Sequence, residues 1–316
     1  MPTLQRLTVI LGTGGTIAGT AASSLDNVGY SAAQIGVQAL VAAVPALAEL
    51  PVETEQVAQI DSRDMSFAVW QQLGRRVAAH LARDEVGGVV ITHGTDTLEE
   101  TAYFLHRVLA PGKPVVLTAA MRPATSLQAD GPQNLLDAVT VAREPGARGV
   151  VAVLAGEVFH AADLHKAHSY RLHAFEAGDA GLLGRVEAGR LRRFREWPGG
   201  DGLGLAAIER APASWPRVEI VLNHAGADGR IVDALLAQGL DGLVLAGTGN
   251  GSLSAALQAA ALRALSAGIR VWRASRCAAG PLIGGDEDGL RGAGVLSPVQ
   301  ARIELLLQLL AAAPPA

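Results

Sequence analysis

The chain has 316 residues, of which 49% are hydrophobic and 18% are charged, and its formal net charge is -4. A chain of this length and composition can form two α/β domains with full cores, and it does not have the composition of a disordered protein. The small negative charge excludes the basic surface that nucleic-acid binding requires, and no apolar run approaches the roughly 18 residues that cross a bilayer.

Two further features concern the cellular setting. Cys277 is the only cysteine, which excludes an internal disulfide and a cysteine-rich metal site. Residues 1–6 lead directly into the first predicted strand, without the apolar segment of a signal peptide. We therefore expect a soluble, cytoplasmic protein that has neither nucleic acid nor a membrane as a partner.

The first predicted strand and its turn read LTVILGTGGTIAG, from Leu7 to Gly19. The apolar run 7–11 predicts a buried parallel strand, and the glycines after it allow close backbone approaches that present Thr13 and Thr16. Thr13 is the candidate nucleophile. The dinucleotide-binding fingerprint needs a third glycine where this chain has Ile17, so the chain matches only part of that fingerprint. From this turn alone, a nucleotide site and a purely structural turn both stay open.

Four more strands are predicted in the following 140 residues. A loop at 20–30 ends in Tyr30, and the strand at 52–60 ends in the sequence Asp61-Ser62-Arg63-Asp64. The strand at 88–92 leads to Thr95 and Asp96, the strand at 114–118 leads to Ala120, and the strand at 149–154 precedes an irregular segment that contains Lys166.

Amphipathic helices are predicted between these strands, at about 35–44, 66–81 and 97–109 and from residue 130. Ser66 or Asp64 caps the second helix, and Thr97 with Glu100 predicts a capping box for the third. The alternation predicts a parallel sheet covered on both faces, with right-handed crossovers and all carboxyl ends at one edge. Six residues should gather there: Thr13, Ser62, Thr95, Asp96, Ala120 and Lys166.

The pattern breaks between residues 190 and 216 into charged residues, glycines and prolines, which is typical of a linker. Strands near 218–222, 243–246 and 269–273 and a helix near 298–310 then predict a smaller α/β unit. We expect an N-terminal domain at 1–190, a linker at 191–216 and a C-terminal domain at 217–316.

Hydroxyls, a carboxylate and an amine at one edge are what acyl transfer through a threonine needs. A threonine hydroxyl is a weak nucleophile until a nearby base accepts its proton. Lys166 can act as that base if its surroundings favour the neutral amine, with Asp96 holding it in place and Thr95 between them.

Five ordered motifs carry a resemblance to a known family: TGGTIAG at 13–19, ITHGTDTLEETAYFL at 91–105, AMRP at 120–123, DGPQNL at 130–135 and AGTGNGSL at 246–253. With these motifs the chain resembles the bacterial-type L-asparaginases over nearly its whole length. The resemblance implies a flavodoxin-like N-terminal domain, a smaller C-terminal α/β domain, and a homotetramer built from two intimate dimers. It also implies hydrolysis of asparagine, and in some members glutamine, without a cofactor or metal.

Site residues follow from the motif positions. The resemblance assigns Thr13 as the first nucleophile with Tyr30 as its loop partner, and Thr95, Asp96 and Lys166 as a second triad. It places Ser62 on the substrate α-carboxylate and Asp96 on the α-amino group, with Ala120 at the pocket and Asn250 contributed by a neighbouring subunit. Preorganised donors, the backbone amide of Thr95 among them, would hold the oxyanion.

Two positions depart from the family pattern. Arg63 stands where many periplasmic members have glutamine, and we expect it either to pair with Asp96 or to turn towards the substrate carboxylate. The chain is also shorter around 282–291, where Asp286 or Glu287 aligns only loosely with a partner-subunit glutamate of those members. Because arginine fills more of the pocket, we expect a preference for asparagine over the longer glutamine.

Residue types alone leave several possibilities open beside an asparaginase. Thr13, Thr95 and Asp96 taken singly also fit turn and cap roles. The histidines at 160, 165, 168 and 173 raise the possibility of a metallohydrolase, although their spacing is not that of a helical ligand pair and a solvated loop fits them better. The same motifs are also compatible with a glutaminase-asparaginase of broader specificity and with an amino-acid binding module that has no turnover.

Overall fold

The computed structural model describes residues 6–284 and 289–312. Its internal contacts divide the chain into two compact units, one up to Leu205 and one from Ala206. The division falls inside the range that the sequence assigns to the linker. Each unit has its own sheet, and each is described here by itself.

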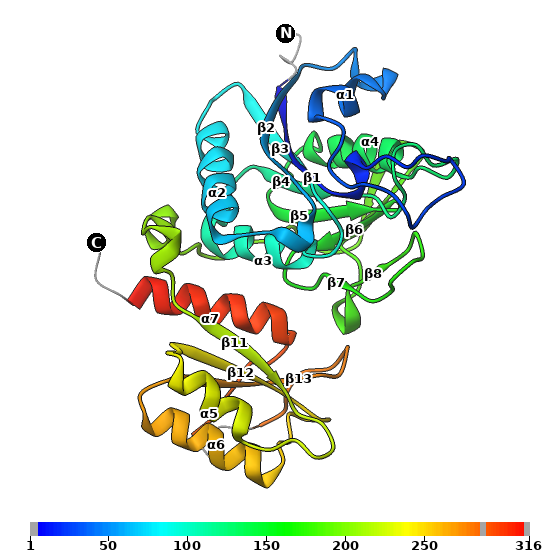
Figure 1. Cartoon of the computed structure of the whole chain (residues 1–316). Coiled ribbons are helices and arrows are strands. Elements are labelled where there is room, and N and C mark those ends of the chain that lie inside the picture. The colour runs from blue at the N-terminus through cyan, green and yellow to red at the C-terminus, as the bar shows by residue number, and fades with distance from the viewer. Residues whose placement is uncertain (1–5, 285–288, 313–316) are drawn as a thin grey trace. The chain divides into compact units, whose positions relative to one another are not determined.

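The N-terminal unit is built on an eight-stranded sheet in the order β10-β9-β6-β5-β4-β3-β1-β2 (Figure 1). Its parallel part contains β1 (Leu7–Gly14), β2 (Val52–Ile60), β3 (Val86–Thr92), β4 (Pro114–Thr118) and β5 (Gly149–Leu154). The strands β3, β4 and β5 are buried along nearly their whole length, as their continuous apolar sequences predict. The spatial order 2-1-3-4-5 is that of flavodoxin-like sheets, so the predicted fold class is confirmed.

Short strands lie where the sequence predicts an irregular segment. β6 (Glu157–His160), β9 (Gly184–Glu187) and β10 (Arg190–Arg193) extend the large sheet in antiparallel fashion. β7 (His165–Lys166) and β8 (Phe175–Glu176) form a separate two-stranded ribbon. The prediction of irregular structure around Lys166 is wrong in this respect, because two-residue strands carry too few side chains for a period to be visible in the sequence.

Four helices cover the two faces of the large sheet: α1 (Val37–Ala42), α2 (Phe67–Leu81), α3 (Leu98–Leu109) and α4 (Gly131–Ala142). One hydrophobic cluster joins α1 and α4 to the sheet residues Ile10, Val90 and Val116, whereas α2 and α3 contact each other on the opposite face (Figure 1). Along the sheet, β4 follows β3 and β5 follows β4 in the same direction. The helix α3 connects the first pair across one face and α4 connects the second pair across the other face, so the two crossovers have opposite hand. The β4–α4–β5 crossover is the exception to the right-handed rule, and the expectation that all crossovers are right-handed is wrong.

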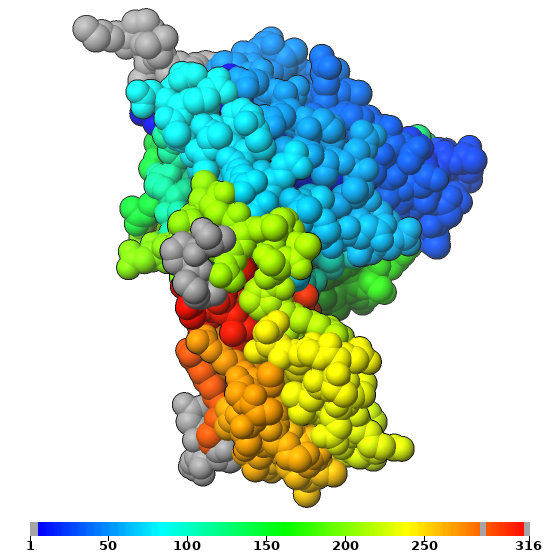
Figure 2. Space-filling view, turned by 60° about the vertical axis from the view of Figure 1, so that its left-hand side comes forward, coloured from blue at the N-terminus to red at the C-terminus, as the bar shows by residue number. Residues whose placement is uncertain are grey.

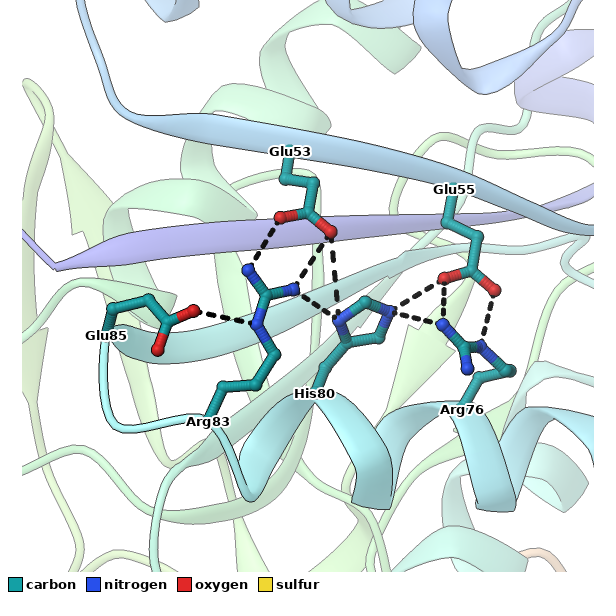
Figure 3. Close-up of polar contacts among 6 residues, drawn as sticks. All are labelled: Glu53, Glu55, Arg76, His80, Arg83 and Glu85. Atoms are coloured by element: carbon teal, nitrogen blue, oxygen red, sulfur yellow. Dashed lines mark hydrogen bonds and ion pairs between the residues drawn. The ribbon is translucent and has the colours of Figure 1, made fainter.

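A polar network joins the edge strand β2 to the end of α2 (Figure 3). Arg76 donates to both carboxylate oxygens of Glu55 at 2.6 and 2.7 Å, and the buried His80 contacts the same carboxylate through Nε2 at 2.7 Å. Arg83 pairs in the same bidentate way with Glu53 and also reaches Glu85. Charged side chains on an edge strand also discourage pairing with another chain, so this network protects the sheet edge.

The C-terminal unit contains a parallel sheet in the order β11-β12-β13-β14, made of β11 (Val218–Leu222), β12 (Gly242–Gly247), β13 (Arg270–Ser275) and β14 (Arg291–Gly292). The helices α5 (Arg230–Ala237) and α6 (Ala255–Ser266) pack on one face in a cluster around Val232, Leu245 and Leu257. The long helix α7 (Pro298–Ala312) packs against β11, β12 and β13 on the other face (Figure 1). This unit agrees with the smaller α/β unit predicted from the sequence.

Candidate active site

The carboxyl end of β1 places the candidate nucleophile in the interior of the N-terminal unit. Thr13 is 2% exposed, and its hydroxyl donates to the carbonyl of Thr92, the last residue of β3, at 2.9 Å. Gly15 has φ 82°, and a Cβ there would collide with the backbone of Gly94, so only glycine lets the β1 and β3 turns approach this closely. The two predicted motifs are thus brought into direct contact.

The loop at 19–31 closes back on this turn, and Figure 2 shows it in dark blue at the margin of the N-terminal unit. Thr20 and Ser31 pair at its base, and Tyr30 shares a 2.7 Å hydrogen bond with the hydroxyl of Thr16. The structure therefore brings Tyr30 to the second hydroxyl of the turn, while the Thr13 hydroxyl is engaged with Thr92.

The loop after β3 gathers the second group of predicted residues. Lys166, at the end of β7, donates from Nζ to Thr95 Oγ1 at 2.9 Å and to Asp96 Oδ1 at 2.6 Å. Thr95 is 5% exposed, the Asp96 side chain is 54% exposed and the Lys166 side chain is 18% exposed. The hydroxyl and the amine are thus largely shielded, while the carboxylate is open to a ligand with a positive charge.

Ser62 ties the end of β2 to the same loop. Its hydroxyl accepts the backbone N–H of Asp96 at 3.2 Å, and its carbonyl accepts the hydroxyl of Thr97 at 2.8 Å. Thr97 is the N-cap residue of α3, but its side chain makes no capping bond. The predicted capping box with Glu100 is therefore wrong: it requires the Thr97 oxygen to accept the backbone N–H of Glu100, and the hydroxyl is instead turned towards the carbonyl of Ser62, to which it donates. Ser66, by contrast, caps α2 through the N–H of Val69, as predicted.

Beneath the loop lies a chain of buried hydrogen bonds that sequence reasoning missed. Trp70 of α2 donates from Nε1 to the Thr101 hydroxyl of α3 at 2.8 Å, and that hydroxyl contacts His93 Nε2 at 2.9 Å. His93 Nδ1 lies 2.7 Å from the carbonyl of Gly94, which can only accept, so the ring proton is on Nδ1 and Thr101 donates to Nε2. Burial lowers the pKa of His93 to about 4, against a smaller opposing effect of the Gly94 carbonyl.

This geometry supplies the groups that acyl transfer needs. Two shielded hydroxyls, Thr13 at the end of β1 and Thr95 in the loop after β3, lie on segments that touch at Gly15 and Gly94, and an amine within hydrogen-bonding distance of the second is positioned to move a proton. Neutral His93 and its partners keep the loop in place from below without adding charge to the site.

Comparison with known proteins identifies the family. Residues 8–198 match the family model for the N-terminal asparaginase domain, and residues 217–315 match that for the glutaminase/asparaginase C-terminal domain. The chain belongs to the asparaginase family. The relationship predicted from the sequence motifs is therefore confirmed.

Individual relatives agree over most of this asparaginase chain. A glutaminase-asparaginase of Pseudomonas fluorescens biotype A is 39% identical over 278 residues, which are 87% of this chain and 76% of the relative. L-asparaginase 2 of Escherichia coli (strain K12) is 37% identical over 309 residues, 95% of this chain and 88% of the relative. The crystal structure of a probable cytoplasmic L-asparaginase from Campylobacter jejuni superimposes with a TM-score of 0.89 at 36% identity, covering 96% of this chain and 95% of the other.

The remaining predicted residues of this asparaginase lie as follows. Ala120 is fully buried just after β4. The Arg63 side chain is 73% exposed and pairs through Nε with Asp61 at 3.2 Å and Asp64 at 4.0 Å. This arrangement is neither of the two that we expected, since local carboxylates hold the guanidinium before it reaches Asp96. In the C-terminal unit, both polar atoms of the Asn250 amide bond to the backbone of Ile283 at 2.8 Å.

Four further points concern predicted residues, metal ligands and partners. Asp286 and Glu287 lie outside the described residues. Among the described residues, histidines, cysteines and carboxylates nowhere gather in a group of three that could hold a metal ion. We expected His160 to lie in a solvated loop. It lies instead in β6, with its ring 5.0 Å from that of His106, so this expectation is wrong for His160.

Within residues 6–284 and 289–312, the helices are too short or too polar to cross a membrane.

Proposed function

We propose that this protein is an L-asparagine amidohydrolase that forms aspartate and ammonia through a threonine acyl-enzyme. The observation that carries the proposal is the pair of shielded hydroxyls, Thr13 at the end of β1 and Thr95 in the loop after β3, where the two segments touch at Gly15 and Gly94, with Lys166 Nζ 2.9 Å from the Thr95 hydroxyl. Relatives named L-asparaginase and glutaminase-asparaginase support the substrate class.

In the proposed course, the Thr13 oxygen attacks the side-chain amide carbon of asparagine while its proton passes to a base. The carbon–nitrogen bond then breaks, ammonia leaves with that proton, and water hydrolyses the ester to restore the Thr13 hydroxyl. Lys166 is the base of the second triad, oriented by Asp96 and acting through Thr95. The backbone N–H of Thr95 is among the donors that hold the oxyanion.

Recognition of the substrate follows from the same loops. Asp96 is an exposed carboxylate that suits the α-ammonium group, and Ser62 lies beside it to bind the α-carboxylate. Arg63 follows Ser62 directly and is held by Asp61 and Asp64, and its positive charge favours the α-carboxylate. No cofactor or metal is required for these steps.

We also propose a cytoplasmic homotetramer, a dimer of dimers in which Asn250 reaches the site of a neighbouring subunit. The family resemblance supports the assembly, and the name of the Campylobacter jejuni structure supports the location, although a relative from Haemophilus influenzae is named a probable periplasmic L-asparaginase.

The decisive experiment measures ammonia release from asparagine and glutamine by the purified protein, with and without hydroxylamine. An acyl-enzyme transfers its acyl group to hydroxylamine, so aspartyl hydroxamate should form together with ammonia. Equal turnover of glutamine would favour a glutaminase-asparaginase of broader specificity, which the Pseudomonas fluorescens relative suggests. Binding of asparagine without ammonia release would favour the binding module and contradict the proposal.

A further inference from the structure

Lys166 does not lie on the large sheet but on the separate ribbon of β7 and β8 (Figure 1). Its backbone pairs with Phe175, and the N–H groups of Ala167 and His168 bond to the carbonyl of Ala174. These bonds hold the ribbon together but do not join it to the sheet. The position of the amine relative to the loop after β3 therefore depends on what attaches the ribbon to the rest of the N-terminal unit.

The base of the ribbon is attached by apolar packing. Leu164, just before β7, and Phe175 in β8 are buried. The turn at the other end lies outside this packing, since Tyr170 is 48% exposed. Inside the turn, Nδ1 of His168 accepts the N–H groups of Tyr170 and Arg171, both at 3.0 Å. The turn is thus closed by its own hydrogen bonds, and a contact that holds the turn also orients the ribbon.

Arg122 makes such a contact. Its Nη1 donates to the carbonyl of Tyr170 at 2.8 Å and to that of Met121 at 3.3 Å, and its guanidinium carbon lies 4.1 Å from the centre of the Tyr170 ring. Arg122 is 6% exposed, and its Nε has no hydrogen-bond partner among the residues that the structure describes. Burying a cation is costly, and the carbonyl and the ring of Tyr170 offset part of that cost.

Arg122 is itself fixed to the large sheet by the motif DGPQNL. The carboxylate of Asp130 accepts the N–H groups of Arg122 and of the residue before it, both at 3.0 Å. The buried Asn134 donates to this carboxylate and to the carbonyl of Ala119, and its oxygen accepts the N–H of Ala155. The segments that follow β4 and β5 are thus tied to the start of α4, which gives the guanidinium a firm support.

We propose that Arg122 is a positioning residue for Lys166. Its guanidinium holds the turn of the ribbon to the sheet. Hydrogen bonds run without a break from that turn along the ribbon to Lys166, whose Nζ is thereby held 2.9 Å from Thr95 Oγ1 and 2.6 Å from Asp96 Oδ1. The inference rests on the proposed function, in which Lys166 acts as a base. It also gives a role to two sequence motifs, AMRP and DGPQNL, that supply no reacting group.

The test compares Arg122→Met with the matched control Arg143→Met. Methionine keeps an apolar stem and removes the charge and the donors. Arg143 donates from Nη1 to the carbonyl of Arg6 at 3.0 Å, at the opposite, amino edge of the large sheet, so its replacement removes a similar bond away from the site. Tyr170→Leu is the third variant, because it removes the ring beside the guanidinium from an exposed position and leaves the carbonyl in place.

Two measurements are made on each protein. Hydrogen exchange followed by mass spectrometry reports the opening of the ribbon at 165–176, and steady-state ammonia release from asparagine gives kcat and KM, with thermal unfolding as a check on the fold. For Arg122→Met we expect exchange at 165–176 to become about tenfold faster or more. We expect kcat to fall about tenfold or more with KM changed less than about twofold, because the base is displaced. Tyr170→Leu should change exchange and kcat in the same directions by about two- to fivefold, and Arg143→Met should change neither.

The outcomes separate the inference from the proposed function. A wild type that releases no ammonia contradicts the function, and the role of Arg122 in catalysis falls with it, whereas the contact with the ribbon is judged by exchange alone. With an active wild type, unchanged exchange at 165–176 in Arg122→Met overturns the inference. Faster exchange with wild-type kcat also overturns it, as does an equal fall of kcat in Arg143→Met. If Arg122→Met does not fold, Tyr170→Leu decides by the same criteria.

Discussion

Replacing Thr101 by valine tests the buried chain of hydrogen bonds beneath the candidate site. The Thr101 hydroxyl is fully buried, accepts from Trp70 Nε1 at 2.8 Å and donates to His93 Nε2 at 2.9 Å. Valine has almost the same shape but no hydroxyl, so two buried polar groups lose their partner at once while the packing is kept.

The expected cost follows from those two groups. A buried donor or acceptor without a partner costs about 1–3 kcal/mol, so the free energy of unfolding should fall by about 3 kcal/mol. For a unit of this size, 1 kcal/mol corresponds to roughly 2–4 °C, which predicts a fall in Tm of about 6–12 °C. Because His93 then holds the Gly94 carbonyl less firmly, kcat should fall with Tm, and KM should change less.

Thr118→Val is the matched control. Thr118 is also fully buried, but its hydroxyl makes a single bond, to the carbonyl of Val153 at 2.8 Å. We expect this variant to lose only about 1 kcal/mol, the usual net value of one hydrogen bond. Thermal unfolding and urea titration of both variants give the comparison. If Thr101→Val is no less stable than Thr118→Val, the hydrogen-bond chain does not stabilise the loop as we argue.

Three further predictions concern catalysis and assembly. Thr13→Ala and Thr95→Val should each lower kcat by at least about 100-fold while substrate still binds, since the hydroxyls act in bond making; near-normal kcat in either would refute its role. Arg63→Gln should change KM more than kcat, since the Arg63 side chain is 73% exposed and pairs only with neighbouring carboxylates; a large change in kcat at constant KM would contradict this. Activity should require association of subunits, and an active monomer in analytical ultracentrifugation would show that Asn250 of a neighbour is not needed.

The ends of the strands could be predicted because a strand that is buried on both faces has a continuous apolar sequence. β3, β4 and β5 are continuous apolar runs, and parallel strands place their carboxyl ends at one edge, so Thr95 and Asp96 could be assigned to that edge before any coordinates. The contact between Lys166 and Thr95 follows from the family resemblance rather than from periodicity. Two-residue strands such as β7 leave no periodic signal.

The partner of each hydroxyl could not be predicted, because a hydroxyl chooses among several acceptors that only the folded chain brings together. Thr97 bonds to Ser62, 35 positions away, instead of capping its own helix. The hand of the β4–α4–β5 crossover could not be predicted either, because the pattern of residue types does not encode it. His93 was visible as a histidine at the end of a buried strand, a place where an unpaired imidazole is costly, and that signal was sufficient to look for its partners.

His93 and Glu99 act in opposite directions on stability between pH 4.5 and 6.5. The pKa of His93 falls on folding from 6.5 to about 4, so the stability it contributes is complete above 6.5 and is lost as the pH falls towards 4. The pKa of Glu99 rises on folding from 4.5 to about 7, so its contribution is complete below 4.5 and is lost as the pH rises through 7. In the wild type the two slopes largely cancel. Burial also lowers the pKa of His160, which adds to the His93 slope.

Glu99→Gln removes one of these two slopes. The free energy of unfolding of the variant, relative to wild type, should therefore increase by about 2 kcal/mol between pH 5 and pH 6.5, because folded wild type holds roughly one proton more than the unfolded chain at Glu99 over these 1.5 pH units. Glu53 and Glu55, whose pKa values are lowered by Arg83 and Arg76, lose their contributions only below 4.5 and are common to both proteins. Urea unfolding of both proteins at pH 5.0, 5.5, 6.0 and 6.5 measures the difference. A difference that stays constant across these pH values would show that Glu99 is ionised in the folded protein throughout, and the raised pKa that we assign to it would be wrong.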